Sequence, residues 1–287
     1  MKYLVVLISI FYGHILFAQD IVYYSSEFKS SGRDIYALDV RSGNAKKLTQ
    51  KSGSGHYPHF INPKLSPDGS TLVYQADTDG HDHYAIWTMK TDGTEKKRIT
   101  SGEGLYPNWS PDGKTIIFSG RRSGVWEIIL VPSEGGKEQI VSKNLENGKR
   151  PGWGATCSFH PDGKSIIYSY IREKVVYSLD LSTEKIQQLT KKGNYTHPIY
   201  SNSGTAIAVN RRLSHTYDLV IISNGEEELM VRGIISYSAP DWVANDSKLL
   251  FVGSVNDNQE LFIVDLKTKT ETQLTKNNYF DAMPVGH

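Results

Sequence analysis

Short runs of apolar, β-branched and aromatic residues make up most of the chain, and clusters of turn-forming residues separate them. The runs TIIF (115–118) and SIIY (165–168) are typical of buried β strands. After the first 19 residues, no stretch repeats its apolar positions with the 3.6-residue period of a helix. The pattern therefore predicts an all-β protein.

The same arrangement of residues recurs along the chain. Four segments align without gaps: LSPDGSTLVYQA (65–76), WSPDGKTIIFSG (109–120), FHPDGKSIIYSY (159–170) and YSNSGTAIAVNR (200–211). A fifth segment, WVANDSKLLFVG (242–253), keeps the aromatic residue and the apolar run but has neither the Pro nor the first Gly. The segments start 41 to 50 residues apart. Periods of this length are typical of the blades of a β-propeller.

Each repeat predicts more than one strand. In SPDG, Pro sets the backbone angle of the second turn position, Asp accepts hydrogen bonds from nearby N–H groups, and Gly adopts the positive φ that closes a hairpin. This turn joins an inner strand to a second strand. Third strands are expected at 34–40, 84–90, 126–132, 174–180, 217–223 and 260–266. More polar fourth strands are expected at 46–50, 96–100, 187–191 and 272–276. A polar strand suits a blade edge that faces water.

The two ends of the repeat region complement each other. Residues 20–26 (DIVYYSS) resemble a second strand without a first, and residues 281–287 (DAMPVGH) resemble an inner strand without a second. We therefore expect the C-terminal strand to join the N-terminal blade and close the ring, which removes open sheet edges. The predicted fold is a six-bladed β-propeller of four-stranded antiparallel blades over residues 20–287.

Residues 1–19 have the features of an export signal. Lys2 gives a positive start, an apolar stretch follows, and Ala18 supplies a small residue at the expected cleavage point. A membrane anchor is the alternative, although Gly13 and His14 interrupt the apolar stretch, which is short for a span. No cysteine follows the stretch, so lipid attachment is not expected. We predict a periplasmic or secreted protein without a membrane span after cleavage.

Charge and cysteine content narrow the function classes. The chain has 32 Lys and Arg against 31 Asp and Glu, which argues against a general nucleic-acid binder. Cys157 is the only cysteine, so no intramolecular disulfide can form. A buried core position is favoured for Cys157 over a nucleophile. The sequence contains no nucleophile elbow, phosphate-binding loop or zinc-protease motif.

Several motifs resemble those of the TolB-type six-bladed propellers. They are LSPDG, WSPDG and FHPDG, together with the Leu-Thr pairs that end outer strands at 48–49, 189–190 and 274–275. The resemblance extends over nearly all of the chain after residue 19. It implies the propeller fold, but this type of propeller also forms peptidase accessory domains, sugar-binding modules and oligogalacturonate lyases. The fold alone therefore leaves the function open.

The predicted propeller has two different faces. The turn face carries the short first-to-second and third-to-fourth turns, such as 66–69 and 110–113, which are alike from blade to blade. The loop face carries the second-to-third connections and the segments that lead into each inner strand. These differ between blades and are rich in His, Tyr, Trp and Arg. Function is therefore expected on the loop face.

The candidate ligand-binding residues of the loop face are His59, His197, Arg121, Arg122, Arg172, Arg211, Arg212, Tyr106, Tyr195, Trp126 and Trp153. Arg binds carboxylate or sulfate through two hydrogen bonds, and aromatic rings stack on sugars. The equally weighted alternative is that these arginines pair with Glu103, Glu127 or Glu173. His197 directly precedes Pro198 at the start of an inner strand, so we expect it near the central channel.

A metal site is the alternative for one loop. His81 and His83, with Asp77, Asp79 or Asp82, have side chains that could ligate a divalent metal. A solvated polar loop is favoured, and no cofactor is expected. Asp68, Asp112 and Asp162 recur in the turns and are assigned no chemistry.

Two functions remain open. The first is a non-catalytic binding module that holds a protein segment or a glycan over the channel mouth, so the partner is a protein or an acidic oligosaccharide. The alternative is a polysaccharide lyase acting on uronate-containing oligosaccharides, in which arginines neutralise the carboxylate and His or Tyr takes the neighbouring proton. The lyase requires His197, the arginines and an aromatic residue to meet in one pocket.

Overall fold

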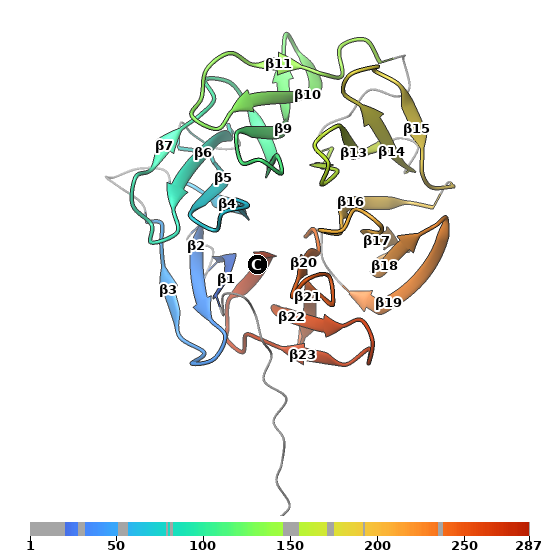
Figure 1. The fold of residues 1–287 in the computed structure, drawn as a ribbon. Helices are drawn as coiled ribbons and strands as arrows, with labels where there is room; N and C mark the ends of the chain where they lie inside the picture. The colour runs from blue at the N-terminus through green and yellow to red at the C-terminus, as the bar shows by residue number, and fades with distance from the viewer. Residues whose placement is uncertain are drawn as a thin grey trace, which may run out of the picture.

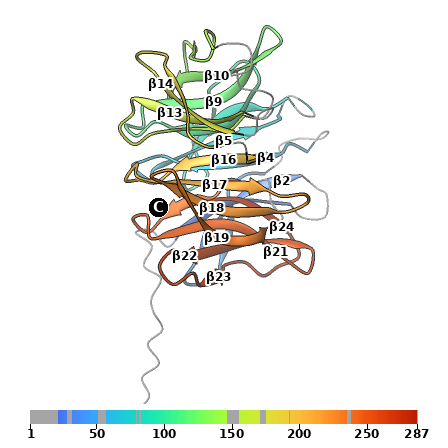
Figure 2. The same ribbon diagram turned by 90° about the vertical axis from the view of Figure 1, so that its right-hand side faces the viewer.

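The computed structural model describes residues 21–27, 32–50, 57–78, 80, 83–145, 155–170, 175–191, 193–234 and 238–286. Within these ranges the chain forms strands and no helix, and the strands form six four-stranded antiparallel sheets. Figure 1 shows the sheets as blades around a central axis, and Figure 2 shows the strands crossing the thickness of the disc. The predicted all-β six-bladed propeller is confirmed. The predicted signal at 1–19 lies outside the described residues.

The blades are numbered from the N-terminus, with the innermost strand given first. Blade 1 contains β24 (Phe280–Val285), β1 (Ile21–Glu27), β2 (Arg33–Asp39) and β3 (Ala45–Lys47). Blade 2 contains β4 (Phe60–Leu65), β5 (Thr71–Ala76), β6 (Ala85–Lys90) and β7 (Lys97–Arg98). Blade 3 contains β8 (Gly104–Trp109), β9 (Thr115–Arg122), β10 (Val125–Pro132) and β11 (Gln139–Ile140).

The remaining blades follow the same order. Blade 4 contains β12 (Cys157–Phe159), β13 (Ser165–Tyr170), β14 (Val175–Asp180) and β15 (Ile186–Gln188). Blade 5 contains β16 (Tyr195–Tyr200), β17 (Ile207–Arg212), β18 (Tyr217–Ser223) and β19 (Glu226–Ile234). Blade 6 contains β20 (Asp241–Val243), β21 (Lys248–Val255), β22 (Asn258–Asp265) and β23 (Glu271–Gln273).

The ring closes as the ends of the sequence predict. Strand β24 pairs antiparallel with β1, so the C-terminal strand supplies the innermost strand of blade 1 (Figure 1). The Ser26 hydroxyl donates to Asp281 Oδ1 at 2.6 Å inside this junction. Burial is the main cause that raises the Asp281 pKa to about 6, and the hydrogen bonds from Ser26 and Asn277 oppose the shift. The closure therefore contains a buried, hydrogen-bonded carboxyl group.

The four predicted outer strands end earlier than expected, each before a Leu-Thr pair or, in blade 2, before Ile99-Thr100. After β3, the Leu48 N–H still donates to the Ile35 carbonyl, and the Thr49 hydroxyl accepts from the Ile35 N–H. The same hydroxyl contact joins Ile86 to Thr100, Ile128 to Ser142, Val176 to Thr190 and Leu261 to Thr275, each at 2.8–3.0 Å. In each of these blades a hydroxyl residue therefore clamps the end of the outer strand to the third strand. It is the Thr of a Leu-Thr pair in blades 1, 4 and 6, Thr100 after Ile99 in blade 2, and Ser142 after Val141 in blade 3.

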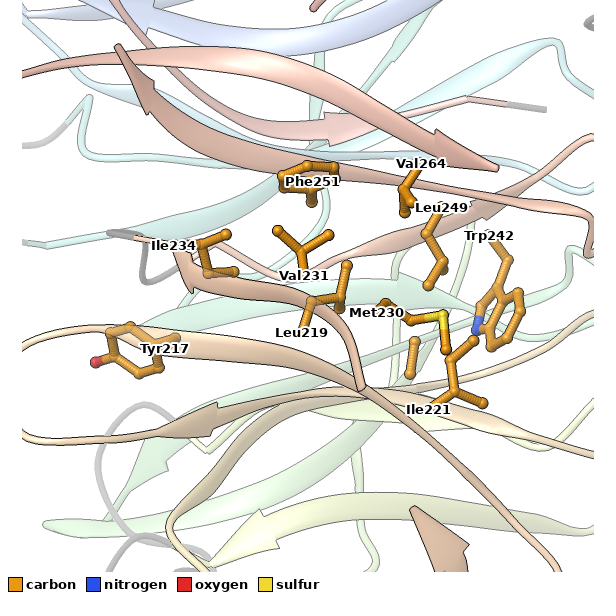
Figure 3. Packing of buried hydrophobic residues seen from close by; sticks show 11 residues of the cluster. Tyr217, Leu219, Ile221, Met230, Val231, Ile234, Trp242, Leu249, Phe251 and Val264 are labelled. Carbon is orange, nitrogen blue, oxygen red and sulfur yellow. The ribbon is translucent and has the colours of Figure 1, made fainter. Parts of the chain in front are cut away.

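The core lies between neighbouring blades. Figure 3 shows the cluster between blades 5 and 6, where Leu219 and Val231 of blade 5 pack with Leu249 and Phe251 of blade 6. All four side chains are buried. Because each blade covers the apolar face of the next, burial of these faces depends on the ring as a whole.

Candidate functional site at the channel mouth

A cavity of about 910 Å³ opens at the turn-face end of the central channel. The ends of all six inner strands line it, together with the turns that follow them. Its lining includes Lys64, Asn108, Ser158, Ile199, Asp241, Val285 and the aromatic residues Trp109, Phe159, Tyr200 and Trp242. We call this space the mouth cavity. Its volume lies in the range of small-ligand sites. The sequence directed attention to the loop face, and this cavity opens on the opposite face.

The repeated aromatic residue of the sequence motif builds the wall of the mouth cavity. Trp109, the last residue of β8, donates its indole N–H to the Lys64 carbonyl of blade 2 at 3.0 Å. Trp242 makes the equivalent contact with the Ile199 carbonyl of blade 5 at 3.2 Å. Each indole therefore ties its inner strand to that of the preceding blade and leaves ring surface along the cavity.

The turn that follows is held by its own residues. Asp112 accepts from the Ser110 hydroxyl at 2.6 Å and from the Lys114 N–H at 3.1 Å, and these bonds lower the Asp112 pKa. Gly113 has φ +68°, in the left-handed region that favours glycine. These turn residues support the mouth structurally, as their recurrence in the sequence predicted.

A β-bulge interrupts four of the inner strands at the same place. The residues concerned are Asn62, Tyr106, His197 and Met283, with φ between 52° and 57°. Each of them directly precedes a proline, and a register shift lies at each position. A bulge re-aims the side chain relative to a regular strand. Three of these residues, Asn62, Tyr106 and His197, line one cavity of the channel.

His197 lies at one of these bulges. The residue is only 9% exposed, and its ring forms a T-shaped pair with the Tyr106 ring, with centroids 5.9 Å apart. The buried Nδ1 atom has no hydrogen-bond partner among the described residues. Burial, and secondarily the charge of Lys64, lower the His197 pKa to about 4, so the imidazole is neutral near pH 7.

A second, smaller cavity of about 40 Å³ lies beside His197. We call it the inner cavity. Asn62, Tyr106, Thr156, Cys157 and Pro198 contribute to its lining, and it shares Lys64, Asn108 and Ile199 with the mouth cavity. The inner cavity therefore adjoins the mouth cavity along the channel.

Lys64 and Asp241 form an ion pair where the two cavities meet. The Lys64 Nζ–Asp241 Oδ1 distance is 3.2 Å, with side-chain exposures of 14% and 9%. Asp241 Oδ2 also accepts from the Gly286 N–H at 3.1 Å. This pair was not predicted from the sequence. Its signal is the repeat itself, because both residues occupy the position before the aromatic site of the motif.

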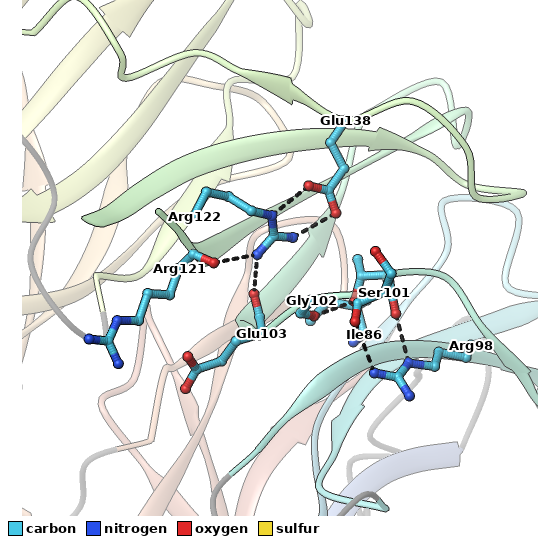
Figure 4. Close-up of polar contacts among 9 residues, drawn as sticks. Ile86, Arg98, Ser101, Gly102, Glu103, Arg121, Arg122 and Glu138 are labelled. Atoms are coloured by element: carbon cyan, nitrogen blue, oxygen red, sulfur yellow. Dashed lines mark hydrogen bonds and ion pairs between the residues drawn. The ribbon is translucent and has the colours of Figure 1, made fainter. Parts of the chain in front are cut away.

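The two candidate arginines of blade 3 differ in their surroundings, since Arg122 is ion-paired and Arg121 is exposed. Arg122 makes two hydrogen bonds to Glu138, at 2.6 and 2.7 Å, and a third to the Glu103 carbonyl at 2.8 Å. In Figure 4 the exposed Arg121 side chain points away from Glu138. Arg121 and the half-buried Trp126 are cross-strand partners at the end of the β9–β10 hairpin.

Arg211 of blade 5 is also held by acidic side chains. It contacts Asp218 and Glu227, each at 3.0 Å. The buried Tyr195 donates its hydroxyl to the same Glu227, and burial is the main cause that raises the Tyr195 pKa to about 12. Arg211 and Tyr195 therefore belong to one ion-paired group. Arg212 is exposed at the end of β17.

The structure brings together only some of the predicted residues. His197 and Tyr106 meet in the channel, Arg211 and Tyr195 meet in blade 5, and the half-buried His59 donates its backbone N–H to Asp77. Arg172, Trp153, His81, Asp79 and Asp82 lie outside the described residues. Among the residues that are described, no group of three or more His, Cys, Asp or Glu side chains could hold a metal.

Cys157 takes the core position that the sequence favours. Its side chain is 4% exposed within the cluster between blades 3 and 4. Burial raises the thiol pKa to about 12, so the thiol is protonated near pH 7.

The fold and its channel define the chain as a six-bladed propeller of the TolB type. A family model described as the TolB beta propeller domain matches residues 18–208, more than half of the chain, and the protein belongs to this family. Within the described ranges, none of the residues forms a helix with the length and apolarity needed to cross a bilayer.

Individual relatives agree with this assignment. The Tol-Pal system protein TolB of Francisella tularensis is 24% identical over 230 residues, which cover 76% of this chain and 50% of that protein. The solved structure of TolB from Acinetobacter baumannii has a TM-score of 0.80 at 18% identity. The match covers 93% of this chain and 66% of that chain. The structure of an oligogalacturonate lyase in complex with manganese has a TM-score of 0.57 at 15% identity. The match covers 87% of this chain and 75% of the lyase chain. The curated relatives are matched over 25–50% of their own length.

Proposed function

We propose that this protein is an exported, non-catalytic binding module that holds an extended segment of a partner protein in the mouth cavity. The observation that carries the proposal is the cavity of about 910 Å³ to which all six inner strands contribute. Aromatic surface from Trp109, Tyr200 and Trp242 lies beside polar groups of Asn108 and Ser158 in its wall. Such a mixture suits a peptide, whose backbone needs hydrogen bonds and whose side chains need apolar contacts.

The chemistry of the wall favours binding over bond cleavage. The Ser110 hydroxyl donates to Asp112, and the Ser66 hydroxyl donates to Asp68. These hydroxyl groups are held by acceptors in their own turns, and none of them contacts a His that could act as a general base. The wall therefore offers recognition groups without a paired nucleophile and base among the described residues.

The relatives support the same class of function. TolB of Francisella tularensis is named as a component of a Tol-Pal system, and an interaction role fits a propeller of that family. The lyase is a more distant structural neighbour at 15% identity. The described contacts leave His197, Arg122 and Arg211 in separate groups. Lyase activity is therefore kept as the alternative function that the experiment below can detect.

Two matched tryptophan substitutions test which face binds. Asn202 is exposed in a turn at the mouth cavity, and Arg212 is exposed at the end of a strand toward the loop face. Peptides are selected from a displayed library on the mature chain and titrated by fluorescence anisotropy. We expect Asn202→Trp to weaken binding about tenfold or more, equivalent to about 1.4 kcal/mol, because the added ring occupies the mouth. Arg212→Trp should bind like the wild type.

Other outcomes would contradict the proposal. Loss of peptide binding in Arg212→Trp alone would place the site on the loop face. Thermal stabilisation by acidic oligosaccharides, without selectable peptides, would indicate a glycan-binding module. Formation of ultraviolet-absorbing unsaturated uronate products would indicate the lyase. Detection of the unprocessed chain in the cytoplasm alone would contradict export.

A further inference from the structure

Hydrogen-bond donors without partners gather around the inner cavity. Lys64 has three ammonium N–H groups, and its only contact with a described acceptor is the one to Asp241 at 3.2 Å. This distance exceeds the 2.7–2.9 Å of a strong charge-assisted hydrogen bond. Asp241 is at the same time engaged by the Gly286 N–H of the ring closure. Lys64 therefore keeps unused donor capacity where the two cavities meet.

Three more lining side chains add donors. The Nδ1 atom of the buried His197 has no partner, and the neutral ring carries an N–H on one of its nitrogens. The Tyr106 hydroxyl makes no hydrogen bond to a described residue, and Asn108 uses only its amide oxygen, which accepts from the Trp109 N–H. Both side chains line the inner cavity together with His197 and Lys64. This set is rich in donors and includes a cation.

Of these four side chains His197 is buried and the other three are half-buried, and a ligand with acceptor atoms would satisfy their donors. Unsatisfied buried polar groups are costly, and the inner cavity of about 40 Å³ has room for a group of a few heavy atoms. A carboxylate supplies two acceptor oxygens and a negative charge for Lys64. We propose that the inner cavity binds a carboxylate, which is carried by an acidic side chain or the C-terminus of the segment held in the mouth cavity. The carboxylate site stands on these side chains alone, and only the source of the carboxylate rests on the proposed function.

Acetate, with acetamide as the uncharged comparison, tests the site without a peptide. The mature chain is labelled with ¹⁵N at histidine, and the imidazole signals are followed during titration with each compound at constant ionic strength. We expect acetate to shift the His197 signals in a saturable way and to bind about tenfold or more tightly than acetamide, as loss of a charged hydrogen bond predicts. Equal binding of the two compounds, or no saturable shift, would overturn the proposal.

Two variants and a control localise the effect. Tyr106→Phe removes one donor from the inner cavity with little change in shape, and Lys64→Met removes the cation. Both should weaken acetate binding, Lys64→Met by about tenfold or more. Tyr200→Phe removes a hydroxyl from the mouth cavity and should bind acetate like the wild type. Unchanged binding in Tyr106→Phe and in a folded Lys64→Met would also overturn the proposal.

Paired peptides separate the source of the carboxylate from the existence of the site. Selected peptides are compared with a free or amidated C-terminus, and with Glu or Gln at each acidic position. The carboxylate that occupies the inner cavity is the one whose amidation, or replacement of Glu by Gln, weakens peptide binding and abolishes competition between the peptide and acetate. Acetate binding without any peptide binding would contradict the proposed function and leave the carboxylate site intact. Peptide binding without selectivity for acetate over acetamide would contradict the carboxylate site and leave the proposed function intact.

Discussion

His197 shows how far a single residue could be interpreted from sequence. Its place before Pro198 predicted a position near the channel, and the side chain lies in the wall of the inner cavity. Its partners were not predictable, because Tyr106 comes from a different blade, 91 residues earlier. The same holds for Arg122, whose partner Glu138 is 16 residues away on the outer side of its blade. The sequence therefore predicted where a residue lies in the fold better than it predicted which residues it contacts.

Protonation of His197 should be visible in the stability of the protein. The His197 pKa is about 4 in the folded chain and ordinarily 6.5, so the group contributes stability above pH 6.5 that is lost as the pH falls through 4. The full difference corresponds to roughly 3 kcal/mol. His197→Asn is the matched variant, since Asn62 occupies the equivalent left-handed position in blade 2. Urea unfolding at pH 7 and pH 4 should show a smaller loss for His197→Asn than for the wild type. Equal losses in the two proteins would contradict the assigned pKa.

Strands are the scale at which the sequence was most informative. The repeated turn and β-type runs predicted the six third strands, and β18 has the predicted bounds, Tyr217–Ser223. The four predicted fourth strands end earlier than expected, because the pairs that follow them, Leu-Thr in three blades and Ile99-Thr100 in blade 2, bond to the third strand. The apolar and polar pattern of these residues does not distinguish a clamp from a continuing strand. The clamp depends on one hydroxyl group.

Two threonines of equivalent position test the clamp. Thr275 accepts from the Leu261 N–H at 2.9 Å and donates to Glu260 at 2.6 Å, whereas Thr190 accepts from the Val176 N–H at 3.0 Å and has Val175 where Glu260 stands in blade 6. Thr→Val at either site leaves a buried N–H unpaired, which costs about 1–3 kcal/mol. Thr275→Val also removes a donor from a buried carboxylate and should cost about 1–2 kcal/mol more. Urea denaturation of the two variants measures the difference. Equal costs would contradict a role for the carboxylate in the clamp.

The whole ring was predictable and the mouth cavity was not. The incomplete repeats at the two ends predicted that β24 would join β1, and this pairing closes the propeller. The similar turns at 66–69 and 110–113 indicated structure, so the sequence directed function to the variable loop face. Those turns are similar because they shape a common rim, and the mouth cavity lies inside it. Convergence of six inner strands is a property of the closed ring and leaves no local signal in any one repeat.

The central claim is that a partner segment occupies the mouth cavity. Hydrogen–deuterium exchange of the mature chain, with and without a selected peptide, tests it most directly. We predict slower exchange at residues 66–71, 110–115 and 201–206, which surround the mouth, and unchanged exchange at 119–126 and 211–217 on the loop face. Protection confined to the loop-face segments would contradict a binding site at the mouth cavity.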